Sequence, residues 1–362
     1  MTVTQEPTLN SLYFQKNIPD IILTKNSVDT SVMFELKRGD NTILQETYVY
    51  DANDSIRIRN LFEIVEKYLN SENLLLDFSY IITEGATTHE STFKVLKCDA
   101  FMTVEAEVWT KLNFLTRSFL EKNTSKSRNE YLSFLQKSAY AAVTVHYKIF
   151  YQTGSTVSDK SGELTTIAAS VSDKVTTFNA SISGVMMAAE LESSVDVIRY
   201  DIWLTGTDFE TYVYTFLIDS MPYRYRTNFV YENAFGVLET FTATGITNND
   251  KKAEFNQGNI ENNYRKVSQD FIVEKTCKSG YLSAEEMEWT DDFVKSYNVG
   301  LYTPGVTGMS EEITLVSIEK NGTNGNTLQA FSFTYRSARN IHLSFANASR
   351  GIFDDTFDET FD

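Results

Sequence analysis

The chain has 362 residues, of which 42% are apolar and 13% aromatic, and its formal net charge is −17. This length exceeds what one ordinary hydrophobic core accommodates and predicts two or three domains. The strong negative charge disfavours nucleic acids and anionic membrane surfaces as partners, because it repels phosphate groups.

The opening residues, MTVTQEPTLNSLYF, contain no basic stretch followed by an apolar one, so no secretory signal is predicted. No run approaches the ~18 apolar residues that span a bilayer. Cys98 and Cys277 lie far apart, and without export we expect two buried free thiols rather than a disulfide. These features predict a protein that is not secreted by means of a signal peptide.

Residues 1–120 are predicted to form a β-sandwich crossed by one amphipathic helix. In Asp54–Asn70 apolar residues recur at helical spacing, and Asp54 or Ser55 can cap the helix. Two pairs of alternating runs predict β-hairpins: Val32–Leu36 with Thr42–Tyr50, and Leu74–Thr83 with Ser91–Leu96.

Glu121–Glu130, with the sequence EKNTSKSRNE, lacks apolar periodicity and is interpreted as a loop or linker. Residues 131–221 are predicted to form a second β-sandwich, because five β-rich runs lie between Ala139 and Leu217, separated by short polar turns. Gly184–Leu191 is either a helical turn or an irregular connection.

Residues 222–345 are predicted to form an α+β domain. Lys251–Tyr264 is polar and asparagine-rich, so we expect a loop or a weakly formed arm, and Lys266–Lys275 is expected to be a strand. Ser283–Ser296 predicts a helix with a capping box from Ser283 and Glu286. Thr314–Glu319 and Thr327–Tyr335 predict another hairpin. The expected fold class is mainly β with an α+β C-terminal part, in consecutive antiparallel β-sandwich domains with few helices.

The segment Tyr223–Gly245 combines aromatic rings, two arginines and two asparagines in a pattern too irregular for one helix or strand. Its rings either pack in a core or bind a partner, and the interleaved arginines favour one exposed face that suits an acidic copy of the same chain. The predicted interface residues of this segment are Tyr223, Arg224, Tyr225, Arg226, Phe229, Tyr231 and Phe235.

Residues 346–362 are predicted to be an acidic tail that is disordered in isolation. It is either a frayed end or a docking peptide. Phe353, Phe357 and Phe361 recur every four residues and would line one face of an induced helix, so they complete the predicted interface.

No constellation indicates catalysis, a metal or a cofactor. His89, His146 and His342 lie in separate segments, and neither HExxH nor CxxC occurs. Glycine-rich phosphate loops and the GxSxG nucleophile motif are also missing. The carboxylates around Trp289 fall on one predicted helix, mostly on its solvated face, whereas a glycosidase needs two that face each other.

The order of these features resembles structural proteins of phages and prophages of gut Bacteroidetes, of the tail or baseplate type. The resemblance rests on Asn228-Phe229, on Asn233-Ala-Phe235-Gly236-Val-Leu-Glu239-Thr240-Phe241, on the Ser279–Ser296 element and on the Phe-Asp-Asp-Thr-Phe ending. It implies a non-enzymatic virion protein that assembles in the cytoplasm with other copies of itself and other virion proteins.

Two alternatives remain at this point. A carbohydrate- or receptor-binding module would use exposed aromatic side chains such as Trp203 and Trp289. A hydrolase of cell-wall or capsule glycans would need two converging acids, which the sequence does not identify.

Overall fold

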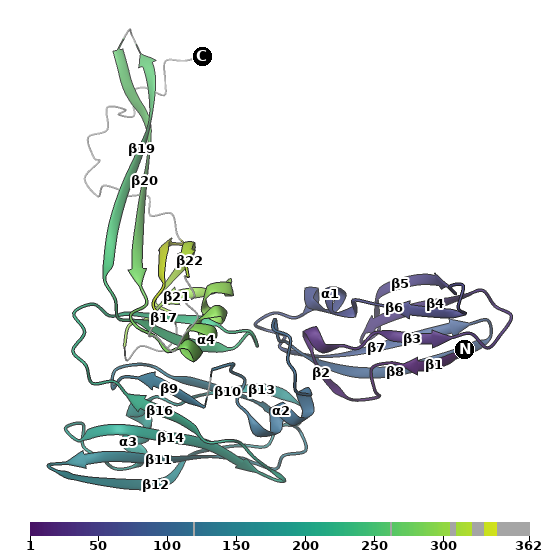
Figure 1. Cartoon of the computed structure of the whole chain (residues 1–362), viewed down its shortest axis with the longest axis horizontal. Coiled ribbons are helices and arrows are strands. Elements are labelled where there is room, and N and C mark those ends of the chain that lie inside the picture. Colours follow the sequence, from purple (N-terminus) through teal and green to yellow (C-terminus); the bar gives the residue numbers. More distant parts are fainter. Residues whose placement is uncertain (119, 261–262, 305–308, 321–328, 339–362) are drawn as a thin grey trace, which may run out of the picture.

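The computed structural model describes residues 1–118, 120–260, 263–304, 309–320 and 329–338, and for residues 251–272 it describes the backbone alone. The predicted fold class is confirmed: the chain is mainly β, with several antiparallel sheets and few helices. The sheets form three units, which we call unit 1 (residues 1–104), unit 2 (residues 105–222) and unit 3 (residues 223–338) (Figure 1).

Unit 1 consists of two sheets that enclose a core. The smaller has the order β1-β3-β6 and the larger the order β2-β8-β7-β4-β5. Their strands are β1 (Thr2–Gln5), β2 (Leu12–Phe14), β3 (Ile21–Thr24), β4 (Ser31–Arg38), β5 (Asn41–Val49), β6 (Ser55–Ile58), β7 (Leu75–Glu84) and β8 (Thr87–Leu96). Both predicted hairpins, β4 with β5 and β7 with β8, are present in antiparallel register.

The long helix predicted for residues 54–70 is wrong. Ser55–Ile58 is strand β6, followed by the short helix α1 (Leu61–Val65) and a 3-10 turn (Glu66–Tyr68); another 3-10 turn (Gln15–Asn17) follows β2. Asn60, directly before α1, has a left-handed backbone conformation with φ 60°, which interrupts any continuous helix. Strand β6 and helix α1 both contribute apolar residues to the same core. Their apolar residues together therefore match the spacing of one continuous helix.

Unit 2 has a six-stranded sheet that includes the order β12-β11-β14-β16-β9, with β15 beside β14, and a separate pair β10-β13. Its elements are α2 (Ala106–Leu112), β9 (Glu121–Thr124), β10 (Tyr131–Gln136), β11 (Val143–Thr153), β12 (Thr156–Ile167), β13 (Lys174–Asn179), α3 (Ile182–Ala188), β14 (Asp196–Gly206), β15 (Phe209–Glu210) and β16 (Tyr214–Ile218). The segment at Gly184 is therefore helical.

The interpretation of residues 121–130 as a loop or linker is wrong for residues 121–124, whereas residues 125–130 lie outside any strand or helix. Glu121–Thr124 is the strand β9, which pairs in parallel with β16. Its burial alternates, with Lys122 and Thr124 buried and Glu121 and Asn123 exposed. The sequence shows no alternation of apolar and polar residues here, because the inward-facing side chains are polar.

Unit 3 is one seven-stranded sheet, in the order β18-β17-β21-β22-β23-β20-β19, packed against a helix. Its elements are β17 (Thr227–Glu232), β18 (Leu238–Ala243), β19 (Thr247–Ile260), β20 (Asn263–Lys278), α4 (Ala284–Lys295), β21 (Val299–Leu301), β22 (Glu311–Glu319) and β23 (Ser332–Ser337). The predicted helix is confirmed as α4, including its capping box of Ser283 and Glu286. The pairing of β22 with β23 is also confirmed, although residues 321–328 between them lie outside the described residues.

The expectation of a loop or weakly formed arm at Lys251–Tyr264 is corrected. Residues 247–260 and 263–278 form one long antiparallel hairpin, β19–β20, which projects away from the three units (Figure 1). The local sequence is poor in β-branched residues, so pairing along the hairpin, not strand propensity, defines these strands.

A fourth apolar core joins the three units. Phe14 and Leu96 come from unit 1, Leu115 and Leu135 from unit 2, and Phe235 from unit 3. The ring centroids of Phe14 and Phe235 lie 5.8 Å apart in an edge-to-face arrangement. We call this cluster the junction core; it fixes where the polar contacts between the units lie.

Candidate functional site

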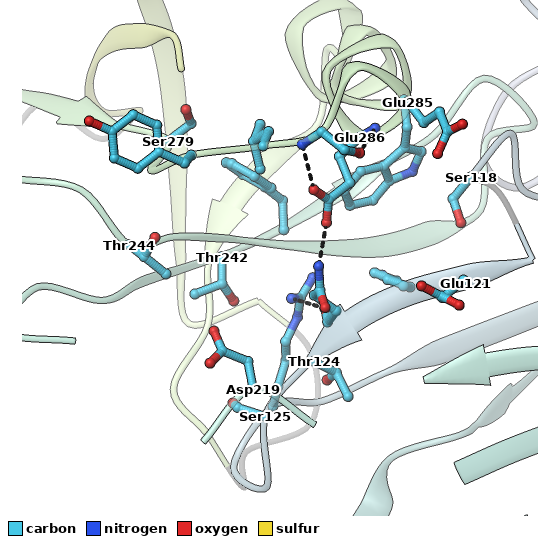
Figure 2. A pocket seen from close by; sticks show the side chains of 18 of the residues that line it. Ser118, Glu121, Thr124, Ser125, Asp219, Thr242, Thr244, Ser279, Glu285 and Glu286 are labelled. Carbon is cyan, nitrogen blue, oxygen red and sulfur yellow. Dashed lines mark hydrogen bonds between the residues drawn. The ribbon is translucent and has the colours of Figure 1, made fainter. Parts of the chain in front are cut away.

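The most polar part of the interior lies where unit 2 meets unit 3. Strand β9 and the loop after it face strand β18 and the N-terminus of α4 across a cavity of about 440 Å³ (Figure 2). Buried charged side chains form its floor, and aromatic and carboxylate side chains form its walls and rim.

Lys122 and Arg128 line the floor of the cavity, and both pair with Glu130, which is fully buried behind the lining. Its carboxylate accepts hydrogen bonds from Lys122 Nζ at 2.9 Å, from Thr124 Oγ1 at 2.7 Å and from Thr240 Oγ1 at 2.8 Å. The guanidinium of Arg128 lies 2.9 Å away. Thr240 belongs to unit 3 and the other four residues to unit 2, so this carboxylate joins the two units.

The charge state of the floor follows from these contacts. Burial opposes ionisation of Glu130, but the cations Arg128 and Lys122 outweigh it, so the pKa of the Glu130 carboxyl is lowered. Burial lowers the pKa of Lys122 despite Glu130. One carboxylate thus serves two buried cations, and a second is needed nearby.

Glu239 supplies that second carboxylate from β18. It accepts hydrogen bonds from Thr116 Oγ1 at 2.8 Å, Asn233 Nδ2 at 3.0 Å and Trp289 Nε1 at 3.1 Å. Lys122 Nζ is 4.0 Å away. Burial raises the pKa of Glu239, because no cation lies as close to it as Lys122 lies to Glu130.

Asn233 explains why the Asn-Ala-Phe-Gly segment has its shape. Its Oδ1 accepts from the backbone N–H of Phe235 at 2.9 Å, and its Nδ2 donates to the carbonyl of Leu115 at 2.9 Å as well as to Glu239. Gly236 has φ +73°, a conformation that other residues rarely adopt. The turn therefore directs Phe235 into the junction core while its polar groups bond to unit 2.

A second ion pair joins the units beside this turn. Arg117 Nη1 lies 2.7 Å from Asp292 Oδ1, and Asp292 Oδ2 accepts from the backbone N–H of Ala234 at 3.3 Å. Burial raises the pKa of Asp292, and Arg117 counteracts it. The prediction that the carboxylates of this helix are mostly solvated does not hold for Asp292, which is 4% exposed.

Of the four carboxylates that line the cavity, two are engaged in hydrogen bonds of the fold. Glu286 accepts from the backbone N–H of Ser283 and from Asn123 Nδ2 at 2.7 Å, and Figure 2 shows it between α4 and β9. Asp219 accepts from the backbone N–H of Met221. Glu121 and Glu285 form no ion pair or hydrogen bond within the described part of the chain.

The structure divides the predicted interface residues into three groups. Tyr223 and Arg226 lie on the cavity wall, and Tyr223 is 40% exposed. The guanidinium of Arg226 lies over the Tyr223 ring, and that of Arg224 over the Tyr225 ring. Arg224 is exposed and Tyr225 half-buried, so these four remain available to a partner.

The second and third groups are not available in this way. Phe229, Tyr231 and Phe235 are each 0% exposed, so their assignment to an intermolecular interface is wrong and they are core residues. Phe353, Phe357 and Phe361 lie outside the described residues. Trp289, expected to be an exposed sugar-binding side chain, is 6% exposed and bonded to Glu239, whereas Trp203 is half-buried and stacks on His146.

Sequence reasoning missed Lys122, Arg128, Glu130 and Glu239. Their partners lie up to 123 residues away in the chain, and no local pattern records such contacts. Both cysteines are buried and free, as predicted. Among the described residues, no group of three His, Cys, Asp or Glu side chains could hold a metal ion.

No protein-family model matches the chain, and a search of curated proteins finds no match. Within the described ranges, no helix has the length and apolar character needed to cross a membrane.

Proposed function

We propose that this chain is a non-enzymatic structural protein of a phage or prophage virion, associated with the tail or baseplate, that acts through protein–protein assembly. It assembles in the cytoplasm and then forms part of the particle. The observation that carries the proposal is the projecting hairpin β19–β20, because its geometry suits an arm that reaches a neighbouring subunit (Figure 1).

The hairpin has a third strand only at its base. Strand β20 pairs with β23 from Glu274 to Lys278, and no other described strand pairs with the hairpin. The pairs from Lys251↔Val273 to Ile260↔Asn263 form a two-stranded ribbon. At ~3.3 Å per residue this ribbon extends roughly 30 Å beyond the sheet.

A two-stranded ribbon is marginally stable in water, because it lacks a core and leaves both edges unpaired. A ribbon of this length gains stability when another surface pairs with or covers it. Residues 251–272 contain four basic and three acidic residues, a net charge of +1 in a chain of −17. Attraction to the acidic body of another copy therefore favours the arm as the contacting element.

The rest of the chain suits a fixed support for such an arm. The junction core and the buried floor of the cavity hold unit 3 against units 1 and 2. Forces on the arm are thereby transmitted to the whole chain. The resemblance to Bacteroidetes phage proteins over Asn228–Phe241 agrees with this role, since that segment contributes the junction.

The proposal is tested on density-banded, DNase-treated particles from an induced culture of the source bacterium. We expect the chain to co-band with capsid and tail proteins in stoichiometric amount by mass spectrometry. Its presence in lysate but not in particles would refute the virion role.

A second experiment tests the arm. Asp250 and Glu274 are register partners, so an Asn-Gly turn in place of residues 251–273 closes the hairpin without disturbing its base. We expect this variant to unfold like the unaltered chain and to lose self-association or incorporation into particles.

A glycan- or receptor-binding role is the second candidate. Tyr281 is 79% exposed and lines the cavity together with Tyr223. The cavity therefore presents two flat rings beside carboxylates. A glycan-binding role predicts that one class of glycan on an array binds the chain and that Tyr281→Ala abolishes this binding. An array without signal would count against it.

A further inference from the structure

A cleft of about 850 Å³ lies between unit 1 and unit 3. It is separate from the cavity described above, and no proposed function so far uses it. Its walls include Ala100 and Phe101 from unit 1 and Tyr297, Ile313 and Leu315 from unit 3. A volume of this size is typical of sites that enclose a ligand or peptide side chains.

Two aromatic side chains at this cleft are unusually exposed. Phe101 is 74% exposed and Tyr297 is 99% exposed. They come from opposite sides of the cleft, one from the segment after β8 and the other from the segment after α4. Paired exposed rings on the walls of a cleft mark a surface that a partner covers.

The charges of the cleft balance, in contrast to the acidic chain as a whole. Four basic and four acidic residues line it, whereas the whole chain carries −17. Two of the acids, Glu66 and Asp292, are paired with Lys16 and Arg117. Lys97 and Lys295, like the acids Asp99 and Glu232, form no ion pair within the described part of the chain, so the two lysines can pair with carboxylates of an occupant.

The chain itself leads to this cleft. Strand β23 ends at Ser337, whose register partner is Ile313 on the cleft wall. The backbone N–H of Ala338 donates to the carbonyl of Glu312 at 2.9 Å. Ala338, the last described residue, therefore lies beside the cleft, and 12 residues of sequence, 339–350, separate it from Gly351.

We propose that residues 351–362, GIFDDTFDETFD, dock in this cleft of their own chain. Phe353, Phe357 and Phe361 share one face of a helix at a spacing of four residues, and they pack against Phe101, Tyr297 and the apolar wall. The five carboxylates of the segment lie beside Lys97 and Lys295. Over a tether of 12 residues the r.m.s. reach is about 20 Å, which gives an effective concentration in the millimolar range.

Docking at this position would connect unit 3 to unit 1. The segment would contact both Phe101 and Tyr297. It would thereby stabilise the contact of unit 1 with unit 3, which the junction core also stabilises. This inference does not depend on the virion role, because a glycan-binding protein of the same fold would have the same cleft.

The test measures binding of a fluorescein-labelled peptide, GIFDDTFDETFD, by fluorescence anisotropy. The receptor is the full chain with F353A, F357A and F361A, in which the attached segment cannot compete. We expect saturable binding at least ten-fold tighter than to the unaltered chain, whose own segment fills the cleft. A peptide of the same composition in scrambled order is the control.

A matched pair of receptor variants locates the binding site. Adding Tyr297→Ser to the triple variant should weaken peptide binding about ten-fold. Adding Tyr212→Ser, at a residue of unit 2 that is 50% exposed, should leave it unchanged. Circular dichroism and thermal unfolding of each variant establish that it is folded.

Three outcomes would overturn the inference. One is no binding to the triple variant. Another is equal binding to the triple variant and to the unaltered chain, which would mean that the cleft is not filled by the attached segment. The third is self-association of the unaltered chain that disappears in the triple variant, which would show that the segment binds a second copy. Particle proteomics is not affected by any of them, so failure here is distinct from failure of the virion role.

Discussion

The ammonium group of Lys122 lies 2.9 Å from a carboxylate oxygen of Glu130, and their side chains are 6% and 0% exposed. A charge pair so deeply buried is costly to desolvate, and it persists only where further hydrogen bonds surround it. Here Thr124, Arg128 and Thr240 supply them. The pair therefore makes the contact of unit 2 with unit 3 specific, since an offset of the two units would remove the hydrogen bond from Thr240 and leave the buried carboxylate of Glu130 with one partner fewer.

Glu130→Gln is expected to destabilise the chain by about 3–5 kcal/mol, because it leaves Lys122 and Arg128 buried with one charge too few. Denaturant unfolding followed by far-UV circular dichroism measures the change. Glu121→Gln, at an exposed position of strand β9, is the control and should change stability by no more than about 0.5 kcal/mol. Equal effects of the two substitutions would contradict the role of Glu130.

Glu239→Gln is expected to change how the free energy of unfolding depends on pH. Burial raises the pKa of Glu239, so the unfolded carboxyl loses its proton first. Its contribution to stability is complete below the unfolded pKa of about 4.3 and declines as pH rises through the folded value. The Glu239→Gln variant should lack this decline. Its loss of unfolding free energy at pH 7, relative to the unaltered chain, should be smaller than that of Glu130→Gln.

Glu130 should show the opposite dependence. Its pKa is lowered in the folded chain, so its contribution is present above about pH 4.3 and is lost as pH falls through the folded value. Unfolding midpoints of both variants and the unaltered chain between pH 3 and pH 8 separate the two carboxylates. Parallel curves for all three proteins would show that neither group is coupled to folding.

Gly236→Ala is expected to destabilise the chain by about 1–2 kcal/mol. The residue has φ +73°, and a Cβ atom there would lie 2.7 Å from Leu74 Cδ2 and 2.9 Å from Lys97 Cδ. Gly184→Ala is the matched control: it lies within α3 and a Cβ atom there meets nothing within 4 Å. It should stabilise by about 0.5–1 kcal/mol.

Neither cysteine should react with a thiol reagent in the folded chain. Burial raises the pKa of Cys98 to about 12 and also raises that of Cys277. We expect no rapid reaction with dithionitrobenzoate at pH 8, and two thiols per chain after unfolding. Because Cys98 belongs to the junction core, its rate of labelling also measures opening of that core. Rapid labelling of Cys98 alone would indicate that unit 1 separates from the rest.

Sequence patterns predicted what is local. The β4–β5 and β7–β8 hairpins follow from alternation and turns, and α4 follows from its capping box and from the apolar face of Met287, Trp289 and Phe293. The failures have one physical origin. β9 and β19 carry polar sequences, and pairing with β16 and β20 makes them strands.

The candidate site could not be read from the sequence for a related reason. Charged residues are exposed by default, so Lys122, Arg128 and Glu130 in a polar segment predict a solvated loop. Burial of these side chains depends on Thr240, about 110 positions away. Similarly, Phe235 lies in a segment that fits a surface patch or a core equally well, and only the arrangement of three units decides.

The junction core also affects how the chain is made. Unit 1 contributes Phe14, Leu96 and Cys98 to it, but Phe235 and Val237 are synthesised about 140 residues after Cys98. At about 5–20 residues per second, an apolar surface of unit 1 stays uncovered on the ribosome for roughly 7–30 s. During that interval the nascent chain offers a binding surface to chaperones that the finished protein no longer has.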